Sequence, residues 1–133
     1  MSTVLLDTNI VSFIFKEDSR VRDYAPLLLH QELAIAPMTV AELYQWAALR
    51  HWGETRQQQL EALLKRYTIL PIDIPVCREW ARLRAARTEI GRPISSQAAW
   101  IAATARRYGL PLRTHNPAYY ERIADLQIIT ALR

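Results

Sequence analysis

The feature that most limits the fold of this chain is a short apolar run, Val4-Leu5-Leu6, which ends abruptly in Asp7-Thr8-Asn9. Three apolar residues are too few for a helix, so the run predicts a short buried strand. Strands of parallel sheets are covered on both faces and read as unbroken apolar runs. Ligands of open α/β sheets bind just beyond the carboxyl ends of such strands, so we expect Asp7 at the floor of a crevice. The alternative role for Asp7 is a plain N-cap of the next helix.

Strand-like and helix-like segments alternate along the rest of the chain. The other predicted strands are 33–36, 67–70, 110–114 and 127–130. The predicted helices are 10–15, 20–30, 40–52, 54–66, 75–90 and 96–108, with a helical turn at 119–123. This alternation predicts an α/β fold in which helices flank a mainly parallel sheet of four or five strands. A chain of 133 residues suits one domain, so we expect a single domain over 1–133.

Individual residues mark several helix ends. Thr39 is the expected N-cap of the helix from residue 40, because Glu42 stands three residues later at capping-box spacing. Ser95 is expected to cap the helix over 96–108, and Gly109 is expected to end it. Cys77 is the single cysteine, which excludes an internal disulfide and a cysteine-based zinc site. We expect it to be a small buried apolar residue.

Composition narrows the choice of partners and compartment. Half of the residues are hydrophobic, which argues against disorder. Seventeen basic residues, most of them arginines, outnumber 13 acidic ones, a mild preference for a polyanionic partner. The first residues lack the features of a signal peptide, and no apolar run approaches the roughly 20 residues of a membrane helix. We therefore expect a soluble cytoplasmic protein.

Candidate functional residues follow the predicted strands at one edge of the sheet. Asp7 follows the first strand, Glu42 lies early in the helix after the second, and Asn116 follows the fourth. The first turn of the helix capped by Ser95 should reach the same edge. Carboxylates gathered there would bind Mg²⁺ or Mn²⁺, which prefer oxygen ligands. Such ions polarise a phosphodiester and activate water.

Five motifs in this order resemble those of PIN-domain ribonucleases, and of VapC toxins in particular. They are Leu5-Leu6-Asp7-Thr8-Asn9-Ile10, Val40-Ala41-Glu42-Leu43, Gly91-Arg92-Pro93-Ile94-Ser95, Ala99-Trp100-Ile101-Ala102-Ala103-Thr104-Ala105 and Thr114-His115-Asn116-Pro117. The resemblance spans nearly the whole chain. It implies a three-layer fold, Mg²⁺- or Mn²⁺-dependent cleavage of RNA such as tRNA, a small VapB-like antitoxin that covers the active site, and a homodimer.

The same resemblance assigns roles to individual residues. Asp7 and Glu42 occupy the first two acidic positions, as metal ligands and catalytic groups, and Asn116 falls where relatives have a fourth acidic or amide residue. At the third acidic position this chain has Ala98, where relatives have Asp in Ile-Ser-x-x-Asp-Ala-Trp. An engineered inactivating substitution and a naturally decayed site both give this pattern, and the intact neighbouring residues favour the first.

Two other functions compete with an active nuclease. The main alternative is a catalytically dead PIN-like domain that binds RNA or an antitoxin without cutting RNA. A phosphatase of the haloacid-dehalogenase type is disfavoured, because it needs Asp-x-Asp after the first strand and this chain has Asn9 at the second of those positions. Glu42 could also serve only as the capping partner of Thr39.

Overall fold

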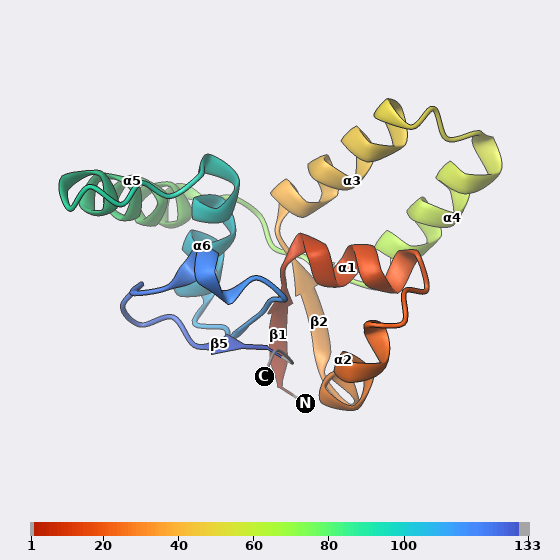
Figure 1. The fold of residues 1–133 in the computed structure, drawn as a ribbon, viewed down its shortest axis with the longest axis horizontal. Coiled ribbons are helices and arrows are strands. Elements are labelled where there is room, and N and C mark those ends of the chain that lie inside the picture. Colours follow the sequence, from red (N-terminus) through yellow and green to blue (C-terminus); the bar gives the residue numbers. More distant parts are fainter. Residues whose placement is uncertain (1, 131–133) are drawn as a thin grey trace.

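The predicted first strand is the central strand of the sheet. The structure, a computed structural model, describes residues 2–130, with the side chain of Leu27 left out. Over these residues five parallel strands form one sheet in the order β3-β2-β1-β4-β5 (Figure 1). The strands are β1 Thr3–Leu6, β2 Glu32–Ile35, β3 Thr68–Ile69, β4 Leu112–Arg113 and β5 Ile128–Ile129. The prediction of a parallel α/β sheet is therefore confirmed.

The sheet register brings residues from the two ends of the chain side by side. Leu5 of β1 pairs with Ala34 of β2 on one side, and Leu6 pairs with Arg113 of β4 on the other. Because all of these strands run in the same direction, their carboxyl ends meet at one edge of the sheet. The residue after β1, Asp7, therefore lies beside the residue after β4, Thr114.

Helices cover both faces of the sheet. One layer contains α1 Thr8–Phe15, α2 Val21–Leu28, α3 Pro37–Leu49 and α4 Glu54–Leu64. The other contains α5 Ile74–Glu89, α6 Ser96–Tyr108 and the short 3₁₀ helix η1, Pro117–Tyr120. In Figure 1 the first layer lies to the right of β1 and the second to its left. Every predicted strand and helix is present, with ends shifted by a few residues.

Residues of β1 alternate between two separate hydrophobic cores. Val4 and Leu6 pack with the α1–α4 layer, and Leu5 packs with α5, α6 and η1. All three side chains are fully buried. Burial of one such side chain contributes about 2 kcal/mol, so this strand joins both cores and fixes the position of Asp7 at its end. The three-layer arrangement expected from the resemblance is confirmed.

Two local predictions were wrong. Helix α3 begins at Pro37 with Ala36 as its N-cap, so Thr39 lies inside the helix and does not cap it. Proline at the first helical position has its φ preset for a helix, and the extended Ala36 before it is the usual conformation preceding proline. Cys77 is exposed, because the buried side of α5 is formed by Val76 and Leu83 and the next residue after Val76 points away from it.

The caps of α6 were predicted correctly. The Ser95 hydroxyl accepts a hydrogen bond from the Ala98 backbone N–H at 3.1 Å. Gly109 ends the helix in the left-handed conformation, with φ of 65°, which favours glycine. These two caps fix where the first turn of α6 begins.

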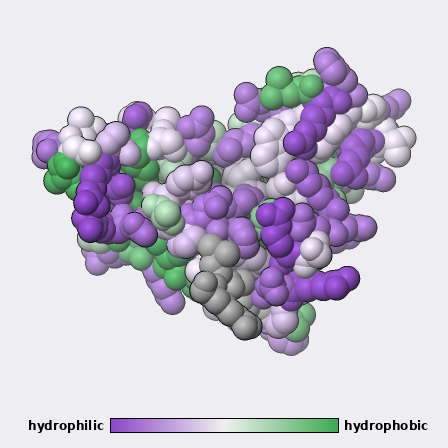
Figure 2. Space-filling model, viewed as in Figure 1, coloured by the Kyte–Doolittle hydropathy of each residue, from purple (hydrophilic) through white to green (hydrophobic). Residues whose placement is uncertain are grey.

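Hydrophilic residues cover most of the face seen in Figure 2, and apolar residues form small separate patches on it. Among residues 2–130 no helix has both the length and the apolar character needed to cross a membrane.

Candidate active site

A cavity of about 310 Å³ lies at the carboxyl edge of the sheet, between α3 and α6. The four residues singled out in the sequence, Asp7, Glu42, Ala98 and Asn116, all line it. The prediction that they surround one crevice is confirmed. They come from the end of β1, from α3, from the first turn of α6 and from the loop after β4.

Asp7 is held by hydrogen bonds to both of its carboxylate oxygens. Its Oδ1 accepts from the backbone N–H of Thr8 at 2.8 Å, which makes Asp7 the N-cap of α1. Its Oδ2 accepts from the Thr114 hydroxyl at 2.7 Å and from the Tyr120 hydroxyl at 2.9 Å. The side chain is 5% exposed. Asp7 is therefore a cap and also a buried, oriented carboxylate in the cavity, which is more than the N-cap alternative accounts for.

Glu42 is connected to Asp7 through Thr8. The Thr8 hydroxyl donates to Glu42 Oε1 at 3.0 Å and lies 2.9 Å from the Thr39 hydroxyl. Since the single Thr8 hydroxyl proton goes to Glu42, the Thr39 hydroxyl donates to Thr8 in this arrangement. Thr39 is fully buried. The Glu42 carboxylate is therefore held in the cavity by the Thr8 hydroxyl, which Thr39 in turn orients, and Glu42 does not act as the capping partner of Thr39.

Ala98 is the third residue of α6 and is 6% exposed. Its backbone N–H donates to the Ser95 hydroxyl, and the residue lines the same cavity as Glu42 and Asn116. An aspartate at this position would add a third carboxylate to the residues that line the cavity. The first turn of a helix carries partial positive charge, which alanine leaves without an anionic partner.

Asn116 is an exposed residue at the start of η1. Its backbone N–H donates to the Thr114 hydroxyl at 3.0 Å, so the hydroxyl that binds Asp7 also fixes the loop carrying Asn116. The same loop is tied to α1 and α2, because the His115 N–H donates to Asn9 Oδ1 and the His115 ring lies 2.6 Å from the Tyr24 hydroxyl.

The cavity is electrically negative. Burial raises the pKa of Asp7 above its ordinary value, although hydrogen bonds from Thr114, Thr8 and Tyr120 oppose the rise. Burial also raises the pKa of Glu42, opposed by the hydrogen bond from Thr8 and reinforced by the negative charge of Asp7. Burial and the Asp7 carboxylate raise the pKa of Tyr120, so its hydroxyl stays protonated and donates. None of the described residues lining this cavity is basic.

Comparison with known proteins identifies the fold family of this arrangement. A family model for the PIN domain matches residues 4–126. The chain belongs to the PIN domain family. Ribonuclease VapC1 of Haemophilus influenzae strain R2866 is 30% identical over 125 residues, which cover 92% of this chain and 93% of that protein. This PIN domain is therefore of the VapC type.

Two solved structures are similar over almost their whole length. The structure of VapBC-1 from nontypeable Haemophilus influenzae gives a TM-score of 0.81 at 26% identity, covering 98% of this chain and 99% of that one. VapBC-5 from Mycobacterium tuberculosis, a member of the VapBC family of toxin–antitoxin systems, gives a TM-score of 0.71 at 28% identity, covering 98% and 99%. The layers of this PIN domain thus follow a known architecture.

The donor atoms in the cavity fit a hard divalent cation held by few protein ligands. Asp7, Glu42 and Asn116 offer oxygen atoms, which Mg²⁺ and Mn²⁺ prefer. Mg²⁺ is commonly bound by one or two carboxylates, with water and substrate phosphate completing its shell. Within residues 2–130 no three Asp, Glu, His or Cys side chains gather closely enough to hold a metal ion. The oxygen donors of this cavity therefore fit Mg²⁺ or Mn²⁺, with two carboxylates among the described residues that line it.

The sequence-based interpretation missed the hydroxyl groups that orient both carboxylates. The sequence pattern places Thr114 at the end of a strand and Tyr120 in a helical turn, and it gives neither residue a contact with Asp7. One sequence feature could have indicated the Thr114 contact: Thr114 stands at the end of the fourth predicted strand, and Asp7 stands at the end of the first. That signal becomes useful only when β1 and β4 are known to be neighbours in the sheet.

Proposed function

We propose that this PIN domain is a metal-dependent endoribonuclease toxin of the VapC type, neutralised by a cognate VapB-like antitoxin, whose activity is impaired by Ala98. The observation that carries the proposal is the pair of buried carboxylates, Asp7 and Glu42, in a cavity lined by no basic residue of the described chain. A polyanionic substrate would be repelled by such a cavity unless a cation entered with it. The raised pKa values of both carboxylates fit a site built to receive positive charge.

Asp7 and Glu42 would hold Mg²⁺ or Mn²⁺ in this site, and Asn116 would support its outer shell. When bound, such an ion polarises a phosphodiester and lowers the pKa of water. The side chains of the PIN domain supply orientation. Thr114 and Tyr120 fix the Asp7 carboxylate, and Thr8 fixes Glu42, which would orient an attacking water. The first turn of α6 faces the same cavity and favours a phosphate there.

The relatives support RNA as the substrate and an antitoxin as the partner. The similar protein from Haemophilus influenzae is named a ribonuclease, and similar structures belong to VapBC toxin–antitoxin systems. Structured RNA, with tRNA as the first candidate, is the substrate class we infer. We also infer a homodimer in solution. The competing proposal is a catalytically dead PIN domain that binds RNA or the antitoxin, and the missing ligand at Ala98 favours it.

The deciding experiment restores the missing acid. We expect Ala98→Asp to raise Mg²⁺- or Mn²⁺-dependent cleavage of total tRNA by about two orders of magnitude or more over the parent protein. Ala98→Asn is the matched control, because it has the same shape without the charge and should stay near the parent level. The same pair should differ in Mn²⁺ affinity by calorimetry, which reports the site independently of cleavage.

Two results would contradict the proposed function. An Ala98→Asp protein that stays inert on tRNA and other structured RNAs with either metal, while it binds its antitoxin normally, would favour the dead-domain proposal. Cleavage that persists in EDTA would exclude the metal.

A further inference from the structure

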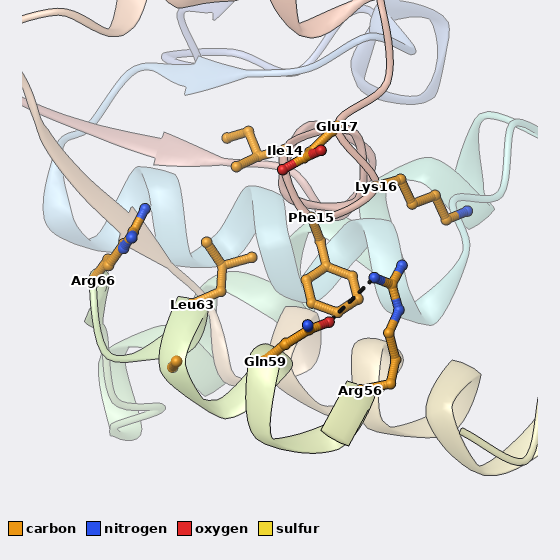
Figure 3. A pocket seen from close by; sticks show the side chains of 9 residues that line it. Ile14, Phe15, Lys16, Glu17, Arg56, Gln59, Leu63 and Arg66 are labelled. Atoms are coloured by element: carbon orange, nitrogen blue, oxygen red, sulfur yellow. Dashed lines mark hydrogen bonds between the residues drawn. The ribbon is translucent and has the colours of Figure 1, made fainter. Parts of the chain in front are cut away.

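A second cavity, of about 490 Å³, lies between the end of α1 and α4, away from the candidate active site. Among the residues that line it, three are basic, Lys16, Arg56 and Arg66, and one is acidic, Glu17. Figure 3 shows Phe15 projecting from α1 into the space next to Arg56 and Leu63 of α4. The second cavity therefore has the opposite charge to the first.

Two of the three basic side chains of this cavity, Lys16 and Arg56, lie against aromatic rings. The Arg56 guanidinium carbon is 4.3 Å from the centre of the Phe15 ring and 5.2 Å from that of Trp52. The two rings are themselves 5.3 Å apart and tilted by 31°. A guanidinium plane held over aromatic rings is ordered before any ligand arrives, so it can bind a phosphate or stack on a base at a low entropy cost.

The second cavity is linked to the candidate active site through Trp46. This residue lines the active-site cavity, and Lys16 Nζ lies 5.1 Å from the centre of its ring. Arg50, one turn further along α3, lies 5.7 Å from the same ring. The basic–aromatic strip, defined here as Phe15, Lys16, Trp46, Trp52, Arg56 and Arg66, thus runs from the wall of one cavity into the other.

We propose that the basic–aromatic strip binds a single-stranded segment of RNA next to the phosphodiester held in the active-site cavity. This inference rests on the proposed function for the identity of the polymer. Cations spaced along a surface bind the sugar–phosphate backbone, and aromatic or guanidinium planes stack on unpaired bases. The strip supplies both groups on a surface continuous with the carboxylate site.

A protein segment is the competing occupant of this surface. A docked amphipathic helix needs a mainly apolar groove, whereas this cavity is lined by charged side chains and glutamine beside its apolar residues. The cavity has three cationic side chains and one anionic side chain, which favours a polyanion such as RNA. The cavity also leads to a site that we propose cleaves phosphodiesters.

The test compares two variants that lose the same charge. We expect Arg56→Gln/Arg66→Gln to bind a fluorescent 20-nucleotide single-stranded RNA about tenfold more weakly at about 0.1 M salt. The dependence of log affinity on log salt should flatten by about 1.4, since two phosphate contacts are lost. The control is Arg78→Gln/Arg82→Gln, which removes two exposed arginines from α5. It should bind this RNA as the parent protein does. Both are measured in EDTA, so binding is read without cleavage.

A second measurement uses the unaltered protein and does not depend on the folding of a variant. RNA that contains 4-thiouridine should cross-link on irradiation to peptides within residues 46–66. Cross-links confined to α5 would overturn the proposal. So would equal losses of affinity in the two double variants, or unchanged RNA binding in a strip variant that loses binding to its antitoxin.

Failure of this proposal and failure of the proposed function give different results. If Ala98→Asp does not cleave RNA but the strip variant loses RNA binding, the nuclease proposal fails and the strip stands. If Ala98→Asp cleaves RNA and the strip variant binds RNA as the parent does, the strip proposal alone fails.

Discussion

The candidate active site and the basic–aromatic strip lie at opposite ends of one helix, α1, and carry opposite charge. Asp7 is the N-cap of α1, and Lys16 is its C-cap. A helix has partial positive charge at its first turn and partial negative charge at its last, so each side chain lies where the helix dipole favours it. The carboxylate end is buried and fixed by hydroxyl groups, whereas the cationic end opens into the second cavity.

Under the two proposals above, this difference assigns catalysis to the buried end of α1 and attraction of RNA to its exposed end. By the proposed function the buried end would hold a cation and a reacting phosphate in a fixed geometry, because three hydroxyl groups restrain its two carboxylates. The exposed end can attract a polyanion over a longer range and tolerate different conformations of it. Activity and RNA affinity should therefore respond to different substitutions.

The largest expected effect comes from a substitution that alters the candidate active site and leaves the basic–aromatic strip unchanged. In an Ala98→Asp background we expect Asp7→Asn to lower RNA cleavage by at least about 100-fold, because it removes the charge of the carboxylate that we propose as the main metal ligand. RNA affinity in EDTA should stay equal or rise, since a negative charge has been removed. Single-turnover cleavage and fluorescence anisotropy give the two numbers. An Asp7→Asn protein that loses RNA affinity as strongly as the strip variant would erase the distinction between the two ends.

A medium effect concerns pH and the loss of folding stability that comes from burying the charge of Glu42. The pKa of Glu42 is raised from 4.5 in the folded protein by burial. A carboxyl group with a raised pKa contributes stability that is present below its unfolded pKa and is lost as pH rises through its folded pKa. We expect Glu42→Gln, which keeps an acceptor for Thr8, to raise the free energy of unfolding at pH 7.5, because the variant has no charge to bury.

Urea unfolding in EDTA at several pH values measures this change. The gain should shrink toward zero near pH 4, where the parent carboxyl is also neutral. Added Mg²⁺ should stabilise the parent more than the variant. A gain that is the same at pH 4 and pH 7.5 would show that the charge of Glu42 is not its cause.

The smallest expected effect concerns the strip. Arg56→Gln should lower the free energy of unfolding by about 0.5–1 kcal/mol, the usual value of a cation–π contact at an accessible site. Arg78→Gln, on the exposed surface of α5, should leave it nearly unchanged. Chemical denaturation of the two single variants measures the difference. A loss of several kcal/mol at Arg56 would mean that the strip supports the fold more than it serves a ligand.

The sequence predicted the layers of the fold because local patterns determine them. The apolar runs, the proline and glycine boundaries and the caps at Ser95 and Gly109 are all local features, and the structure confirms them. The capping box at Thr39 and Glu42 failed because two patterns competed, and proline at the first helical position won. The prediction that Cys77 is buried was wrong because neighbouring residues of a helix point in different directions, so Cys77 faces solvent although Val76 before it is buried.

The sequence predicted which residues gather in the cavity, but it did not predict the hydroxyl groups that orient Asp7. Asp7, Glu42, Ala98 and Asn116 follow or begin elements whose ends converge, so their grouping follows from a parallel sheet. The hydroxyl groups of Thr114 and Tyr120 reach Asp7 only because β4 lies next to β1, and strand order is a property of the whole chain. The basic–aromatic strip likewise depends on the packing of α1 against α3 and α4.

The strand order also has a consequence for synthesis of the protein on the ribosome. The two hydroxyls that hold Asp7 come 107 and 113 residues after it in the chain. Closing so long a loop is costly before the intervening helices have folded, so these contacts form late. A nascent chain that stops before Thr114 has Asp7 and Glu42 but lacks the neighbouring strand and both restraining hydroxyls. The candidate active site therefore forms only after the ribosome has extended the chain past Tyr120.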